Sequence, residues 1–335
     1  MNIVMSYIDY TMAGLSEREA FSCTKTQTSE IYERLKAKRE VLGAVLIATC
    51  NRTELYLSLA EGARVNPFEQ LCEFIGVSYS DYAFMNKTLT GDEAFDHLCK
   101  VAAGAESQIW GDGQIAKQVD SALKAAQEAK ATDAVLNVLF RIGVTAGKRV
   151  KTEVDFNVHD NSTAARAVAA VKAQSDIKDV LVIGNGMIGR LVAGILVRSG
   201  IHTTMTLRQY KHGLNIIPNG VDTVNYSDRY SAIEKSGAVI SATLSPHYTV
   251  CYEQIRELNR VPGLFVDLAV PRDIDPEVEK IEGVTYFDID QISCGSRDAR
   301  QEKQMRQIEA IVGKYRDDFY KWYDFREKLR LKEEA

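Results

Sequence analysis

The sequence predicts an α/β protein of two domains, with an α/β sandwich at the N-terminus, a doubly wound parallel sheet after it and a long C-terminal helix. Three observations support this prediction. Strand and helix patterns follow one another in the order βαββα through residues 1–75. A glycine-rich turn at 184–189 joins a buried apolar strand to a helix, and a heptad-like apolar stripe begins near residue 296.

The N-terminal domain, residues 1–155, is expected to be a ferredoxin-like α/β sandwich. Its strand and helix patterns lie, in chain order, at residues 2–8, 16–39, 41–48, 54–59 and 67–75. Three further helices are expected at 92–103, 114–129 and 134–150, because apolar residues recur there about every 3.6 positions.

The composition is that of an ordinary globular chain of about two domains, with 335 residues, of which 45% are hydrophobic and 26% charged. The formal net charge of -5 argues against a broad electrostatic grip on nucleic acid, although it leaves room for a local basic face. The six cysteines lie far apart, which predicts reduced thiols in the cytoplasm and neither a disulfide framework nor a metal site. We expect neither an export signal nor a membrane span, since the required apolar runs are missing.

Cys50 is the first candidate for chemistry. It follows the apolar strand pattern at 41–48 and is itself followed by polar and charged residues. A thiol at this point would have its thiolate stabilised by Arg52, and a thiolate attacks acyl groups. The competing interpretation is a core cysteine that ends a strand, because cysteine is among the most buried residue types.

The second domain, residues 156–295, is expected to be Rossmann-type, because the strand at 179–183 runs into the motif G-x-G-x-x-G and then into a helix. The first glycine permits the tight turn, the second lets the backbone approach a pyrophosphate, and the third allows the helix to pack closely on the strand. The predicted cofactor-binding residues of this turn are Gly184, Asn185, Gly186, Met187, Ile188 and Gly189.

The residues after the next strand, 202–207, indicate which dinucleotide is bound. NAD-specific proteins place a carboxylate there, whereas this chain has Arg208 and Lys211. Two cations fit a 2′-phosphate, so we expect NADPH. Buried strands at 237–243 and 263–269 should end beside the same cleft, which places Thr243 on its nicotinamide side unless these segments are ordinary loops.

Residues 296–335 are predicted to form one long connecting helix. Its apolar stripe consists of Met305, Ile308, Val312, Tyr315, Phe319, Trp322 and Leu329. Such a stripe requires a partner. Two interpretations remain open, namely docking along both domains of the same chain and pairing with a second chain.

In order and spacing, these motifs resemble those of the glutamyl-tRNA reductases, the enzymes that begin tetrapyrrole synthesis from glutamate. The resemblance is carried by residues 49–56 (Thr-Cys-Asn-Arg-Thr-Glu-Leu-Tyr), 97–98, 104–107, 111–115, 140, 147–149, 184–189, 241–243, 267–276 and 286–290. It extends over residues 1–325, and the cysteine motif together with the Ala-Val-Pro-Arg-Asp-Ile-Asp run at 269–275 is highly specific.

The resemblance implies a two-step reduction of glutamyl-tRNA to glutamate-1-semialdehyde, with residues 1–155 as the domain that binds glutamyl-tRNA and carries the catalytic residues. Cys50 would attack the ester carbonyl and form a thioester, which NADPH would then reduce. His97 would polarise the carbonyl or orient the ester. The residues that would hold the glutamyl group are Thr49, Asn51, Arg52, Ser107, Asp112 and Gln114. Arg52 suits a bidentate grip on the substrate carboxylate. Glutamyl-tRNA is the expected partner, and glutamate-1-semialdehyde aminomutase is a second candidate.

The sequence departs from the family pattern in four places, one of which is Leu-Arg at residues 207–208, where the family usually has Asn-Arg after the second cofactor strand. Residues 9–12 read Asp-Tyr-Thr-Met where members of the family carry Asn-His-Lys-Thr-like residues, and residues 111–114 read Gly-Asp-Gly-Gln in place of Gly-Glu-Pro-Gln. The long helix of the family leads into a helical dimerisation domain, which this sequence lacks, so we expect a monomer or a weak homodimer through the C-terminal helix. Two alternative functions stay open. One is a non-catalytic or regulatory paralogue that binds a tetrapyrrole or a partner, and the other is a reductase of a different acyl donor.

Overall fold

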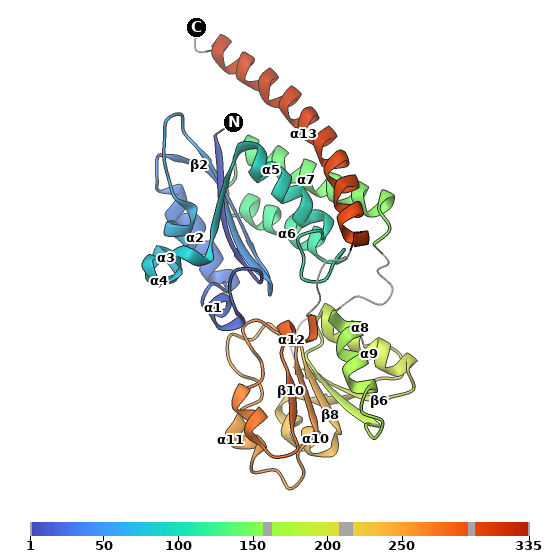
Figure 1. Ribbon diagram of the computed structural model, residues 1–335. Coiled ribbons are helices and arrows are strands. Elements are labelled where there is room, and N and C mark those ends of the chain that lie inside the picture. The colour runs from blue at the N-terminus through green and yellow to red at the C-terminus, as the bar shows by residue number, and fades with distance from the viewer. Residues whose placement is uncertain (1, 157–162, 208–216, 294–298, 334–335) are drawn as a thin grey trace. The chain divides into compact units, whose positions relative to one another are not determined.

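The computed structural model describes residues 2–156, 163–207, 217–293 and 299–333. The chain forms two compact units, one made of residues 1–158 with 296–335 and the other of residues 159–295. Each unit has an α/β fold with its own sheet, one antiparallel and the other parallel, and the C-terminal helix belongs to the first unit (Figure 1). The predicted fold class is confirmed.

The first unit is built on a four-stranded antiparallel sheet in the order β2-β3-β1-β4. Its strands are β1 (Ile3–Asp9), β2 (Val41–Ala48), β3 (Arg52–Leu59) and β4 (Lys87–Thr90). Its helices before the C-terminal one are α1 (Leu15–Ala20), α2 (Lys25–Lys36), α3 (Pro67–Ile75), α4 (Tyr79–Tyr82), α5 (Gly91–Ala103), α6 (Ile115–Glu128) and α7 (Ala134–Glu153), with a 3₁₀ turn η1 (Ala83–Met85). Every residue of β3 is buried, because helices cover both faces of the sheet (Figure 1).

The prediction of one helix over residues 16–39 is wrong, because the structure has two helices there. Phe21 is completely buried and ends α1, and a capping box at Thr24 starts α2. The Gln27 amide donates to Thr24 Oγ1 at 3.3 Å, and the Thr24 amide donates to Gln27 Oε1 at 2.9 Å. A reciprocal pair of this kind supplies hydrogen-bond acceptors to two amides that have no partner within the helix.

The C-terminal helix α13 (Ala299–Glu333) docks on α5 and α7 through its apolar stripe (Figure 1). Ile308, Val312 and Phe319 are buried in the core of the first unit. Phe325, in contrast, is 62% exposed. Docking within the same chain therefore accounts for most of the stripe, and it involves the first unit.

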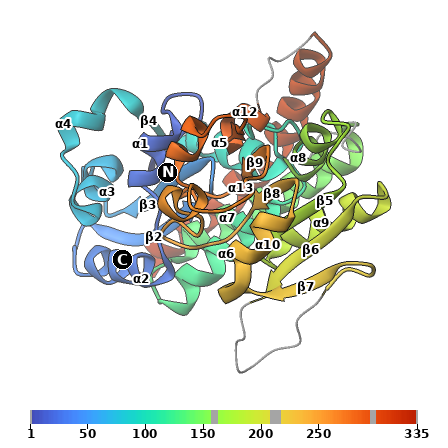
Figure 2. The same ribbon diagram turned by 90° about the horizontal axis from the view of Figure 1, so that it is seen from below.

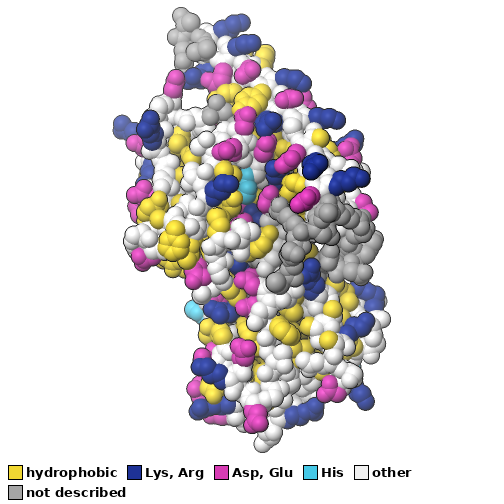
Figure 3. All heavy atoms as spheres, in the orientation of Figure 1, with side chains coloured by type: hydrophobic (Ala, Val, Ile, Leu, Met, Phe, Trp, Pro, Cys, Tyr) yellow, Lys and Arg dark blue, Asp and Glu magenta, His cyan; other side chains and the backbone are white. Residues whose placement is uncertain are grey.

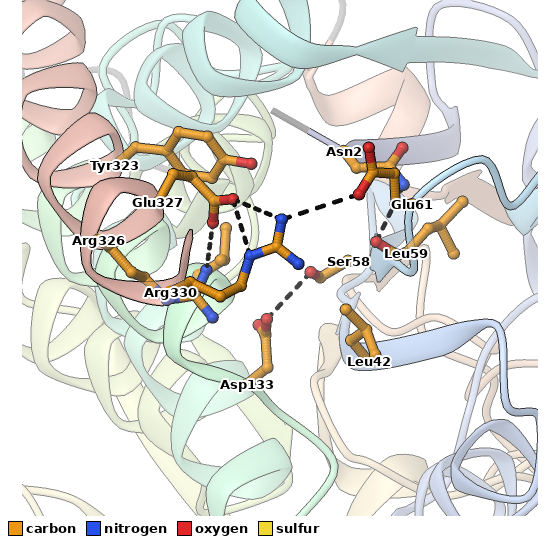
Figure 4. Close-up of a pocket in the computed structure, with 11 residues that line it drawn as sticks. Asn2, Leu42, Ser58, Leu59, Glu61, Asp133, Tyr323, Arg326, Glu327 and Arg330 are labelled. Atoms are coloured by element: carbon orange, nitrogen blue, oxygen red, sulfur yellow. Dashed lines mark hydrogen bonds and ion pairs between the residues drawn. The ribbon is translucent and has the colours of Figure 1, made fainter. Parts of the chain in front are cut away.

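The last turns of α13 line a pocket together with the strands β2 and β3. Figure 4 shows Arg330 between Glu327 of the same helix and Glu61, which follows β3. Arg330 Nη2 lies 3.1 Å from a Glu327 oxygen and 3.8 Å from a Glu61 oxygen. These exposed ion pairs add a polar contact beyond the apolar stripe, and exposed pairs of this kind stabilise only weakly.

The second unit is a six-stranded parallel sheet in the order β10-β9-β8-β5-β6-β7, whose central strands lie side by side in Figure 2. Its strands are β5 (Asp179–Ile183), β6 (His202–Leu207), β7 (Asp222–Asn225), β8 (Ala238–Ser241), β9 (Leu264–Asp267) and β10 (Thr285–Phe287). Its helices are α8 (Thr163–Lys172), α9 (Met187–Arg198), α10 (Arg229–Lys235), α11 (Tyr252–Ile255) and α12 (Ile289–Ser293), with 3₁₀ turns η3 (Tyr226–Asp228) and η4 (Pro276–Lys280). The strand order reverses between β5 and β8, which is where open α/β sheets bind ligands.

Acidic and basic side chains are interspersed on the face shown in Figure 3. Within the described part of the chain, no helix has the length and apolar character that crossing a bilayer requires.

Candidate active site

Cys50 lies in the short turn that joins β2 to β3. The Thr49 amide donates to the Arg52 carbonyl at 2.9 Å, and the Asn51 amide donates to Thr49 Oγ1 at 3.3 Å. The amide of Tyr10, just after β1, donates to the Asn51 carbonyl at 3.1 Å. These bonds hold the turn at the end of a rigid sheet, and the Cys50 side chain is half-buried there.

Arg52, two residues further on, is buried in a network of acceptors. Its Nη1 donates to Glu54 Oε1 at 2.6 Å, its Nη2 donates to the carbonyl of Glu106, and Asp9 Oδ2 lies 3.7 Å from Nη2. Burial by itself would lower the pKa of Arg52, but Glu54 and Asp9 outweigh it and raise that pKa. The guanidinium is therefore a permanent buried cation that links two strands and the segment after α5.

Glu54 is the centre of this network. Its carboxylate accepts hydrogen bonds from Arg52, from Tyr56 Oη at 2.8 Å and from His97 Nε2 at 2.9 Å. Burial alone would raise the pKa of Glu54, but His97 and Arg52 outweigh the burial and lower the pKa to about 2. An ionised carboxylate only accepts hydrogen bonds, so Nε2 is the nitrogen of His97 that carries hydrogen towards it.

His97 is held on a second side by an aromatic ring. The Tyr7 ring, on β1, stacks on the imidazole with centroids 4.3 Å apart and an interplanar angle of 24°. Burial, together with the charges of Asp9, Glu106 and Glu54, raises the pKa of Tyr7 to about 12, so its hydroxyl stays neutral. With Nε2 bound to Glu54 and one face covered, Nδ1 is the nitrogen that remains for a second partner.

The remaining predicted substrate residues lie on the segment between α5 and α6. Ser107 is buried and follows Glu106, whose carbonyl binds Arg52. Asp112 begins the turn into α6, where its Oδ1 accepts from the Gln114 amide at 2.9 Å, and burial raises its pKa. The structure thus gathers the cysteine turn, His97 and the Ser107 segment around one network. Asp112 instead contacts Gln114, and its carbonyl accepts from Lys151 Nζ at 2.5 Å.

Sequence reasoning singled out neither Glu54 nor Tyr7 as a site residue. A detectable signal was present for Glu54, which lies two positions after Arg52 and so on the same face of a strand whose other residues are mostly apolar. A carboxylate and a guanidinium on one buried strand face must pair, because burying either alone is costly. The stacking of Tyr7 on His97 joins residues far apart in sequence and had no local signal.

In the second unit, the glycine turn has the geometry that a dinucleotide requires. Gly184 has φ +104°, and a Cβ there would lie 2.5 Å from the Ala242 carbonyl oxygen. A Cβ at Gly189 would lie 2.0 Å from the Gly184 carbonyl oxygen, so the helix can approach the strand only with glycine at this position. Gly186 is exposed, and a Cβ there would meet nothing within 4 Å, which leaves the start of α9 open to a phosphate.

The other residues of the turn occupy the first positions of this helix. Met187 and Ile188 are the first two residues of α9, and Asn185 lies between Gly184 and Gly186 just before the helix. Thr243 follows β8, and a Cβ at Gly184 would lie 3.1 Å from its methyl group, so both predicted residues border the same end of the sheet. The predicted 2′-phosphate ligands, Arg208 and Lys211, lie outside the described residues.

Comparison with known proteins assigns the chain to a family. Residues 7–154 match the model of the glutamyl-tRNA(Glu) reductase N-terminal domain. The chain is 46% identical over 331 residues to the glutamyl-tRNA reductase of Acetivibrio thermocellus, covering 99% of this chain and 100% of that protein. The chain belongs to the glutamyl-tRNA reductase family.

Other comparisons agree with this assignment. The glutamyl-tRNA reductase of Alkaliphilus oremlandii is 42% identical over 98% of this chain and 99% of its own length. The structure of glutamyl-tRNA reductase from Methanopyrus kandleri matches 98% of this chain and 82% of that chain, with a TM-score of 0.54 and 26% identity. Residues 166–294 match the shikimate / quinate 5-dehydrogenase model, which fits the parallel sheet and its glycine turn. The resemblance inferred from the sequence motifs is confirmed.

Proposed function

We propose that this chain is an NADPH-dependent glutamyl-tRNA reductase, which converts glutamyl-tRNA into glutamate-1-semialdehyde through a thioester on Cys50. The observation that carries the proposal is the cysteine turn beside the buried Arg52–Glu54–His97 network, in a chain that also has an open glycine turn. The relatives named glutamyl-tRNA reductase support an enzyme rather than a non-catalytic paralogue.

In the first step, the Cys50 thiolate attacks the ester carbonyl of the glutamyl group. The new C–S bond forms and the C–O bond to the tRNA ribose breaks, so the ribose hydroxyl leaves with a proton. We propose that His97 orients the ester or exchanges this proton through Nδ1, because Nε2 is bound to Glu54. Thr49, Asn51 and Ser107 are the polar groups that would bind the glutamyl moiety.

Arg52 has a more specific proposed role. A bidentate grip on the substrate carboxylate would require the guanidinium to give up part of its contact with Asp9 or Glu106, since both already lie against Nη2. The contact with Asp9 is the longer of its ion pairs, at 3.7 Å against 2.6 Å for Glu54. We therefore propose that the substrate carboxylate approaches on the Asp9 side. Asp112 and Gln114, at the start of α6, would help to bind the same group.

The second step needs a hydride at the thioester carbon, which NADPH would supply when bound. Loss of the C–S bond would then return the Cys50 thiolate and give the aldehyde. The geometry of Gly184, Gly186 and Gly189 supports a pyrophosphate at this turn, and Thr243, which lies close to Gly184, would border the nicotinamide side. Arg208 and Lys211 support NADPH over NADH, because a 2′-phosphate needs cations where NAD-binding proteins use a carboxylate.

The experiment that tests the proposal measures NADPH oxidation with purified protein and charged glutamyl-tRNA, with uncharged tRNA and free glutamate as blanks. Cys50→Ser is expected to abolish turnover and leave NADPH binding unchanged, since Cys50 lies in the other unit from the glycine turn. Cys251→Ser is the matched control, because Cys251 is a free, half-buried cysteine of the second unit. Full turnover by Cys50→Ser would contradict the thioester, and tighter binding of NADH than of NADPH would contradict the cofactor assignment.

We further propose that the chain is a monomer or a weak homodimer through α13, because Phe325 and Leu329 are exposed near its end. Sedimentation over a range of protein concentrations distinguishes the two states. The product carries a reactive aldehyde next to an amine, so we propose glutamate-1-semialdehyde aminomutase as the enzyme that takes it up. Co-sedimentation of the two purified proteins tests this contact.

A further inference from the structure

The loops that follow β8 and β9 are joined by one buried carboxylate, that of Asp273. Its side chain accepts hydrogen bonds from Ser241 Oγ at 2.7 Å, from the Thr243 amide at 2.7 Å and from Thr243 Oγ1 at 2.5 Å. Ser241 is the last residue of β8, and Asp273 itself follows β9. Both are completely buried, so these bonds are shielded from water and stronger than surface bonds of the same length.

The backbone around Asp273 is also fixed by hydrogen bonds. The Asp273 carbonyl accepts from the Thr249 amide at 2.6 Å and from the Val250 amide at 3.0 Å. The side chain of Asp267, at the end of β9, accepts from the Ala269 amide at 2.9 Å and from the Ile274 amide at 2.7 Å. The loop from 267 to 274 is therefore closed on itself and bonded to the loop that contains Thr243.

This double loop borders the part of the sheet where the nicotinamide half of a dinucleotide belongs. The strand order reverses between β5 and β8, and the glycine turn after β5 fits the pyrophosphate. One half of the dinucleotide then extends over β6 and the other over β8 and β9. Thr243 lies close to Gly184, where the half over β8 and β9 would begin. Residues 270–272 come after the neighbouring strand, β9.

We propose that Asp273 is a positioning residue for the reduction step, which holds Thr243 and the loop after β9 in the arrangement that orients the nicotinamide ring. It acts through Thr243 and has no contact of its own with the reacting atoms. This inference rests on the proposed function, since it assigns a part of the NADPH-dependent half of the reaction. Fixed loops matter for this half because hydride transfer requires near-attack geometry, and a misplacement of about 1 Å can slow a reaction about 100-fold.

Asp273→Asn tests the proposal, because the amide keeps the size of the side chain but replaces one acceptor with a donor that faces Ser241 or Thr243. The two half-reactions are measured separately. Release of tRNA from glutamyl-tRNA without NADPH reports the Cys50 step, and single-turnover reduction of the preformed thioester reports the NADPH step. A fluorescence titration gives the dissociation constant of NADPH without any reaction.

The expected result is a change confined to the second half-reaction. We expect the dissociation constant of NADPH to rise about tenfold and reduction of the thioester to slow on the order of 100-fold, with tRNA release within about twofold of wild type. Asp275→Asn is the matched control. Asp275 directly follows this loop, at the start of η4, and accepts from the amides of Glu277 and Tyr252 instead. This variant is therefore expected to behave as wild type in all three assays.

A second variant separates positioning from general damage to the fold. Thr243→Val removes the hydroxyl that donates to Asp273, and its effect should be non-additive with that of Asp273→Asn, because both break the same contact. If Asp273→Asn does not fold, Thr243→Val and Ser241→Ala carry the test. An unchanged NADPH affinity and reduction rate, or an equal loss in both half-reactions, would overturn the proposal. Absence of tRNA release by wild type would instead overturn the proposed function, and the NADPH titration would still report on Asp273.

Discussion

At the scale of single residues, the site is organised by the carboxylate of Glu54, which acts through the side chains bound to it. Glu54 receives hydrogen bonds from Arg52, Tyr56 and His97, and so determines both the direction of a guanidinium and the tautomer of an imidazole. Buried ion pairs are weak evidence for stability, because desolvation offsets most of the attraction. We therefore interpret the network as a device that positions Arg52 and His97 for the chemistry at Cys50.

Glu54→Gln should show what this network contributes to stability and how the contribution depends on pH. We expect the free energy of unfolding of the first unit to fall by about 3–5 kcal/mol at pH 7, because Arg52 would be left buried without its main carboxylate. The folded pKa of Glu54 is lowered to about 2, so the wild-type contribution is present above the unfolded pKa and is lost as pH falls from about 4.5 towards about 2. Urea unfolding at several pH values measures both effects.

The matched control for this prediction is Glu93→Gln. Glu93 is an exposed residue in the first turn of α5, the helix that carries His97. This substitution should change the stability by no more than about 0.5 kcal/mol. If the two variants proved equally stable between pH 4.5 and pH 7, the assignment of Glu54 as a buried, ionised centre would be wrong.

At the scale of elements, α13 is a helix whose two parts have different surroundings. The first part is covered by α5 and α7, and salt bridges join Arg316 to Asp96 at 2.8 Å and Lys100 to Glu309 at 3.0 Å. Phe319 is completely buried, with its ring centroid 5.4 Å from that of Phe95. The helix therefore contributes to the hydrophobic core of the first unit over most of its length.

Phe319→Ala is expected to destabilise the first unit by about 3–5 kcal/mol, because it removes a buried ring and leaves a cavity between α13 and α5. Chemical denaturation followed by a probe in the first unit measures the change. Phe325→Ala on the same helix should alter stability by less than about 0.5 kcal/mol, since Phe325 is 62% exposed. Equal losses in the two variants would show that the end of α13 is covered in solution, for example by a second chain.

At the scale of the whole molecule, the two units divide the proposed reaction between them. The proposed nucleophile, Cys50, and the network beside it belong to the first unit, and the glycine turn with its neighbouring loops belongs to the second. A covalent thioester on one unit and a hydride donor bound to the other, as proposed, would explain why the same chain needs both. The half-reactions can therefore be measured apart.

Hydrogen–deuterium exchange should reveal this division directly. Saturating NADPH is expected to slow exchange at residues 184–189 and 243–245 and in the first turn of α9, because bound ligand protects the amides that it contacts. The amides of β1, β2 and β3 should exchange at the same rate with and without the cofactor. Protection confined to the first unit would place the cofactor elsewhere, and a matched experiment with NADH tests the selectivity.

Much of this architecture was predictable because it depends on local pattern. The limits of β2, α3 and β6 follow from apolar periodicity and from turn residues next in the chain, and the predicted ranges agree with them. Short edge strands such as β4, β7 and β10 were not predicted, because three or four residues with partial burial carry too little pattern. The break at residues 21–24 was missed because burial of Phe21 and the capping pair at Thr24 outweighed a continuous helical pattern.

By itself, the sequence determined the cysteine turn and the glycine turn, since each lies in a short run of adjacent residues. It also indicated the fold class and the family, through the order and spacing of such runs along the chain. Only the tertiary structure decided which groups surround them. Glu54 meets His97 across 43 positions, and Asp273 meets Thr243 across 30. Neither pairing has a local signal, because a buried charge finds its partner through the packing of whole strands and helices. The chemistry of the chain is therefore specified locally, and its geometry is specified by the fold.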